Sequence, residues 1–125
     1  MNVIGSRPTG WWRDRPGAVR TLLQRLARYA AAEHVAVTVV IDGRPLPDIP
    51  EGQHDGIDVL YARRTGRNAA DDRIIEYLAA ASDPPAVEVV TSDRELATRA
   101  RSLGAHVSGP QQLLDSLDRV EPPNP

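Results

Sequence analysis

The chain contains 125 residues, carries a formal net charge of −2 and has no cysteine. This length suits one domain that buries about two-thirds of its unfolded surface, and the missing thiols exclude disulfides, a thiolate zinc site and a cysteine nucleophile. All 15 basic residues are arginine, which excludes a phosphate-loop lysine. No apolar run approaches the roughly 18 residues of a membrane span, so a soluble cytoplasmic protein is expected.

The N-terminal part of the sequence predicts a turn-rich segment followed by a helix. The adjacent residues Trp11 and Trp12 could stack on unpaired bases, although packing of an indole on the core is the ordinary alternative. From Ala18 to Glu33, apolar residues recur at helical spacing with arginines between them. This pattern predicts an amphipathic helix that covers a sheet.

Two strands are predicted in the next part of the chain. Val35–Ile41 is almost continuously apolar and β-branched, which is typical of a strand buried on both faces. Asp42 follows at its carboxyl end, although Asp-Gly is also an ordinary turn pair. The stretch 44–56 contains three prolines and predicts a loop without regular structure. Ile57–Tyr61 alternates and predicts a short strand near an edge of the sheet.

A basic loop follows the second strand and contains Arg63, Arg64 and Arg67. The planar guanidinium forks suit phosphate groups, whereas a solvated charge run is the ordinary alternative. Its position directly before a pair of acids favours a functional role.

The acids Asp71 and Asp72 fall in the first turn of a predicted helix whose N-cap is Asn68. Acids in a first turn can merely complement the helix dipole. Together with a third acid at a neighbouring strand end, they could instead share a divalent cation, because Mg²⁺ and Mn²⁺ prefer oxygen ligands.

The third acid is Asp93. Strand-like Val87–Val90 runs into Thr-Ser-Asp, and a helical pattern starts at once, as at a strand-to-helix junction of a parallel α/β sheet. Asp93 is therefore predicted at a strand's carboxyl end, where open α/β sheets place ligand sites, and at a helix N-cap, which could be its whole role. The remaining predicted elements are a helix ending at Gly104, a strand over Ala105–Ser108 and a helix from Pro110.

Three segments carry a resemblance to a known family: Asn2–Gly5, Ala70–Ile75, and Val89–Leu96 followed by Gly104-Ala105. In this order they resemble the NYN domains of the YacP type, relatives of PIN-domain ribonucleases. The resemblance spans residues 1–119 as a single domain and leaves 120–125 as a tail. It implies a three-layer α/β/α sandwich with a mainly parallel sheet, whose clustered carboxylates bind Mg²⁺ or Mn²⁺ and cut RNA, usually as an endonuclease.

Carried over to this sequence, the resemblance makes Asp71, Asp72 and Asp93 the catalytic acids and metal ligands, with Asp42 as a further ligand. If the three acids converge without metal, like-charge repulsion is expected to raise the pKa of at least one of them. The predicted substrate-binding residues combine the family motifs with the local arginines: Asn2, Ser92, Arg63, Arg64, Arg67 and Arg94.

Asn2 occupies the last position of the family's first motif, Asp-Gly-x-Asn, so the chain lacks the motif's Asp and most of the strand before it. Loss of a central strand would leave backbone groups of its neighbours unpaired. We therefore expect the natural protein to begin several residues upstream, with an apolar strand that ends in Asp-Gly.

The function predicted from the sequence is a metal-dependent ribonuclease, with RNA as its partner, including RNA on the ribosome. The alternative is a non-catalytic RNA- or ribosome-binding module that keeps the fold without the chemistry. A small-molecule phosphatase or nucleotide binder is disfavoured because the sequence has no glycine-rich phosphate loop. A homo-oligomer is compatible with the sequence, and a membrane partner is not expected.

Overall fold

The computed structural model describes residues 15–64, 66 and 68–120. Helices and strands alternate along the chain, which confirms the predicted α/β class. None of the helices in this part of the chain has the length and apolar character needed to cross a membrane. The elements are, in order, α1 (Arg15–Glu33), β1 (Val37–Ile41), β2 (Gly52–His54), β3 (Ile57–Tyr61), α2 (Ala69–Ala80), the 3-10 helix η2 (Pro84–Ala86), β4 (Glu88–Val90), α3 (Arg94–Ser102), β5 (His106–Ser108) and α4 (Pro110–Val120).

The described strands form two sheets. In the first, the order is β1-β3-β2, with β1 parallel to β3 and β2 antiparallel to it. In the second, β4 and β5 pair in parallel, with Val90 opposite Ser108. Because parallel neighbours end at the same edge, the carboxyl ends of β4 and β5 lie together, as do those of β1 and β3. The predicted parallel pairing is thus found within each sheet.

The middle of the first sheet differs from the prediction. Ile57–Tyr61 was expected near an edge, but β3 lies between two neighbours, and alternate residues Ile57, Val59 and Tyr61 are buried. The stretch 44–56 was expected to lack regular structure, and this was wrong, because it returns as β2 and pairs with β3. A strand of three polar or small residues has no hydrophobic period, so only its partner reveals it.

Strand β1 is also less buried than its sequence predicts. Only Ile41 is buried, and the other four residues of the strand are half-buried. Among the described residues β1 has a hydrogen-bonded neighbour on one side alone, which is β3. The apolar composition of β1 is typical of a strand with neighbours on both sides, whereas the described residues provide one neighbour.

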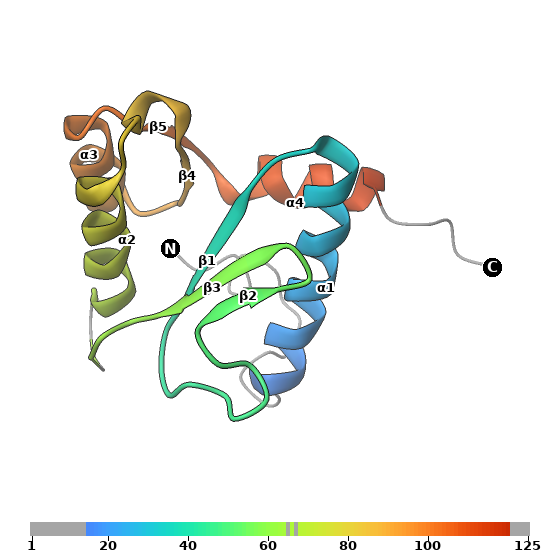
Figure 1. The fold of residues 1–125 in the computed structure, drawn as a ribbon. Helices are drawn as coiled ribbons and strands as arrows, with labels where there is room; N and C mark the ends of the chain where they lie inside the picture. The colour runs from blue at the N-terminus through green and yellow to red at the C-terminus, as the bar shows by residue number, and fades with distance from the viewer. Residues whose placement is uncertain (1–14, 65, 67, 121–125) are drawn as a thin grey trace.

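The described core has two parts. One joins α1 and α4 to the first sheet, and the other joins α2 and α3 to β4 and β5. Figure 1 shows α1 and α4 together on one side of the first sheet, with α2 and α3 together on the other. Helices thus lie on both sides of strands, as the predicted layered sandwich requires. The largest fully buried side chains are Ile57, Leu78, Leu96, Leu117 and Val59.

Two predicted helix ends can be compared with the structure. Gly104 has a φ of 94° and its N–H donates to the Arg101 carbonyl, while the N–H of Ala105 donates to the Ala100 carbonyl. These two bonds form a Schellman motif, which confirms the predicted end of α3. Asn68 precedes α2 as predicted, but it adopts a left-handed conformation and its side chain makes no capping hydrogen bond.

Candidate active site

The junction between β4 and α3 holds Asp93 in a defined position. Its Oδ1 accepts a hydrogen bond of 2.9 Å from the backbone N–H of Leu96, so Asp93 is the N-cap of α3 as predicted. The backbone N–H of Asp93 donates to Oγ1 of the buried Thr91, also at 2.9 Å. These local bonds fix the turn at the carboxyl end of β4, and with it the direction of the carboxylate.

A pocket of about 470 Å³ opens at this junction, beside the carboxyl ends of β4 and β5. Its walls include the predicted residues Ser92, Asp93 and Arg94, together with Arg101 from the next turns of α3. The sequence-based reasoning missed Arg101. Its signal was present, because residues seven apart lie on the same face of a helix, and Arg94 and Arg101 have this spacing. One aspartate and two arginines are thus among the residues that line the pocket.

The adjacent acids of α2 lie in different environments. Asp71 is buried, with 8% of its surface exposed, and Asp72 is exposed. Oδ2 of Asp72 accepts a hydrogen bond of 2.6 Å from Arg64, and its Oδ1 accepts one of 3.1 Å from Arg99. These bonds, first with Arg64 and then with Arg99, hold the pKa of Asp72 below its ordinary value. The rise in pKa expected for crowded acids does not occur at Asp72, because its close neighbours are cations.

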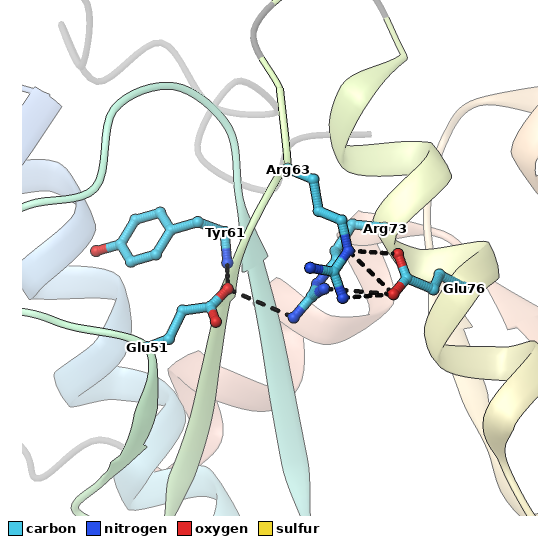
Figure 2. Close-up of polar contacts among 5 residues, drawn as sticks. All are labelled: Glu51, Tyr61, Arg63, Arg73 and Glu76. Carbon is cyan, nitrogen blue, oxygen red and sulfur yellow. Dashed lines mark hydrogen bonds and ion pairs between the residues drawn. The ribbon is translucent and has the colours of Figure 1, made fainter.

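Arg63 belongs to a separate network between the loop after β3 and the middle of α2. Its Nε lies 3.0 and 2.7 Å from the two carboxylate oxygens of Glu76, and this pairing raises the pKa of Arg63 above its ordinary value. Figure 2 shows Arg73 beside this pair, reaching Glu51 at 3.4 Å and Glu76 at 3.5 Å. Glu51 also accepts a hydrogen bond from the backbone N–H of Tyr61. Two arginines thus face two glutamates, which leaves the network without net charge.

Arg73 is the buried member of this network, with only 10% of its side chain exposed. Its Nε is buried and has no hydrogen-bond partner within the part of the chain that the structure describes. Its other nitrogens face the two half-exposed glutamates. Arg73 therefore joins α2 to the β2 end of the first sheet, and Arg63 strengthens the same link.

The described residues do not offer a preformed site for a divalent cation. Within residues 15–64, 66 and 68–120, no three histidine, aspartate or glutamate side chains gather closely enough to hold a metal ion. Both oxygens of Asp72 already accept hydrogen bonds from arginine. Asp42 is exposed at the end of β1 in the first sheet, whereas Asp93 follows β4 of the second sheet. Of the predicted substrate-binding residues, Asn2 and Arg67 lie outside the described residues.

Comparison with known proteins gives one family and one fold. The chain matches the family model for the YacP-like NYN domain over residues 10–123. It is 22% identical to a point mutant of Rae1 (YacP) from Bacillus subtilis, with a TM-score of 0.76, covering 95% of this chain and 71% of that one. A second Rae1 (YacP) structure from Bacillus subtilis gives 22% identity, a TM-score of 0.69 and coverages of 95% and 70%. No curated protein matches the chain.

Proposed function

This chain belongs to the YacP-like NYN domain family, and from that membership we propose that it is an endoribonuclease that hydrolyses RNA phosphodiesters. The observation that carries the proposal is the pocket at the β4 to α3 junction. There, a carboxylate fixed by its own turn lies beside Arg94 and Arg101. This combination suits phosphodiester cleavage, because the phosphate is an anion and the attacking water must lose a proton.

The proposed chemistry divides the work between the two kinds of side chain. The guanidinium groups of Arg94 and Arg101 bind the phosphate, for which their planar forks are suited. Asp93 accepts the proton of a water as it attacks phosphorus, and the leaving RNA oxygen departs and takes a proton from solvent. Ser92 supplies a hydroxyl on the same wall, and the buried Asp71 is a second acid that we assign to the catalytic machinery.

Dependence on Mg²⁺ or Mn²⁺ is a separate part of the proposal, and it rests on the resemblance to metal-dependent nucleases. The described carboxylates do not by themselves fit such a cation, so no step above passes through one. Cleavage measured with Mn²⁺ and then with excess chelator tests this part alone. Loss of cleavage on chelation supports it, and undiminished cleavage contradicts it.

The test of the ribonuclease proposal is a cleavage assay on an end-labelled, unstructured RNA, resolved on a denaturing gel. Asp93→Asn is the informative variant, because asparagine caps helices as well as aspartate does but cannot accept the proton. We expect its rate to fall at least about a hundredfold, the usual lower bound for loss of a general base. Arg119→Gln, at the far end of α4, is the matched control and should cut at the parent rate. Equal rates for Asp93→Asn and the parent would remove Asp93 from the mechanism.

The second candidate function is a non-catalytic RNA- or ribosome-binding module. The pairing of Asp72 with two arginines favours it, because that carboxylate faces cations that suit RNA phosphates. This candidate predicts RNA binding that survives chelation and depends on salt, with no cleavage by the parent protein. Under either candidate RNA is the partner, and a cytoplasmic location remains part of the proposal.

A further inference from the structure

We propose that Arg64, Asp72 and Arg99 form a phosphate clamp, in which the two guanidinium groups bind the RNA backbone and Asp72 is a positioning residue rather than a cation ligand. We call these three residues the Asp72 clamp. The inference rests on the proposed function for its substrate class, which is single-stranded RNA. It adds Arg99, which no sequence pattern indicated, and it gives Asp72 a role different from that of the other acids.

The geometry of the clamp draws on three parts of the chain. Arg64 comes from the loop after β3, Asp72 from the first turn of α2, and Arg99 from α3. Each carboxylate oxygen of Asp72 accepts a hydrogen bond from one arginine, at 2.6 and 3.1 Å. An arginine side chain that is not held in place loses conformational entropy when a ligand orders it. Because Asp72 already orders both, part of that loss occurs before RNA binds.

The charge of the clamp favours an anion. Two guanidinium groups and one carboxylate sum to one positive charge. A divalent cation at Asp72 would meet both guanidinium groups next to the oxygens it must bind. A phosphate would instead meet the side chains of Arg64 and Arg99, which are 54% and 39% exposed. The exposure of the two arginine side chains and the net positive charge of the clamp therefore both favour a phosphate over a cation.

The neighbouring network around Glu76 does not have this excess of positive charge. There, Arg63 and Arg73 face Glu51 and Glu76, so the charges cancel, and Arg73 is almost completely buried. That network joins elements of the fold and offers no excess positive charge. The Asp72 clamp has one more arginine than it has acids.

Binding of a short fluorescein-labelled single-stranded RNA, followed by anisotropy in EDTA over a series of KCl concentrations, tests the two arginines. Each phosphate contact to a single strand contributes about 0.7 to the slope of log affinity against log salt. We expect Arg64→Gln and Arg99→Gln each to lower the slope by about that amount, and the double variant by about twice as much. Arg119→Gln removes the same charge elsewhere and should leave the slope unchanged. Equal slopes for Arg99→Gln and the parent would overturn the clamp.

The role of Asp72 is tested by a double-mutant cycle in the same assay. If Asp72 positions Arg99, the affinity lost through Arg99→Gln is smaller in the Asp72→Asn background than in the parent. If Asp72 only neutralises charge, Arg99→Gln weakens binding by the same factor in both backgrounds, which would overturn the positioning role. Calorimetric titration with MnCl₂ gives a second readout. We expect Asp72→Asn to match the parent, and weaker Mn²⁺ binding by the variant would make Asp72 a cation ligand.

Failure of the clamp can be distinguished from failure of the proposed function. The binding assay contains no metal and detects no cleavage, so it reports on RNA binding separately from the chemistry at Asp93. Cleavage that is abolished by Asp93→Asn but does not respond to Arg99→Gln would keep the ribonuclease and remove the clamp. Salt-dependent RNA binding through Arg99 in a protein that never cuts RNA would keep the clamp and remove the ribonuclease.

Discussion

We expect the hydroxyl group of Tyr61 to contribute strongly to the free energy of unfolding, because it makes two buried hydrogen bonds. Tyr61 is 3% exposed, and its hydroxyl donates to the carbonyl of Ile49 at 2.5 Å and accepts from the backbone N–H of Leu46 at 3.2 Å. The same two residues form an isolated β-bridge in the proline-rich stretch before β2. One oxygen thus satisfies a buried donor and a buried acceptor, and it holds that stretch against β3.

Tyr61→Phe removes these two bonds while keeping the ring that packs in the core. Each buried backbone group left without a partner costs about 1–3 kcal/mol. Leu46 and Ile49 are 8% and 6% exposed, so neither backbone group is well hydrated in place. A pocket of about 490 Å³ lined by Leu46 and Tyr61 can admit water beside them, which favours the lower end of the range. We expect a loss of about 2 kcal/mol in the free energy of unfolding.

Urea denaturation measures this loss, provided that the slope against denaturant stays constant between variants. Tyr77→Phe is the matched control, because it deletes the same atom from a side chain that is 42% exposed. The Tyr77 hydroxyl lies 3.5 Å from Oγ1 of Thr38, a weak contact, and we expect a change within about 0.5 kcal/mol. A Tyr61→Phe protein as stable as this control would refute the reasoning from buried hydrogen bonds.

Three further outcomes can be measured in the same urea titrations. Asp93→Ala removes the N-cap of α3 and should cost about 0.5–2 kcal/mol, whereas Asp93→Asn should stay close to the parent. Arg64 and Arg99 lower the pKa of Asp72. The stability that this pairing gives the fold is therefore fully present above the unfolded pKa of about 3.9 and is lost as the pH falls through the lowered pKa. The stability difference between the parent and Asp72→Asn should therefore shrink on acidification, and a difference that grows would contradict this pairing. Gly104→Ala, at a φ of 94° and with its new Cβ 3.5 Å from Pro84, should cost about 1–2 kcal/mol, and Gly109→Ala, with open space around it, should cost less.

The elements that the sequence predicted well are those with a local cause. Strand β3 was predicted with its observed bounds because alternation is a property of adjacent residues. The N-cap at Asp93 and the end of α3 at Gly104 also depend on a few neighbouring backbone groups. Local signals of this kind also predicted the strand-to-helix junction that holds Asp93.

The features that the sequence did not predict depend on contacts between distant segments. Strand β2 exists because β3 offers it hydrogen bonds, and its own residues carry no strand pattern. The partner of Asp72 in α3 lies 27 positions away, and nothing near Arg99 distinguishes it from the other arginines of that helix. Ion pairs between exposed side chains have no periodicity, so no sequence pattern indicates them.

The different environments of Asp71 and Asp72 follow from helical geometry that the sequence does contain. Neighbouring residues of an α-helix point about 100° apart, so two adjacent acids at the edge of the apolar stripe can lie in different environments. Asp71 is seven residues before the buried Leu78 and shares its face, whereas Asp72 is turned towards the surface. This difference supports the two proposed roles, in which the buried Asp71 belongs to the catalytic machinery and the exposed Asp72 positions arginines for a polyanion.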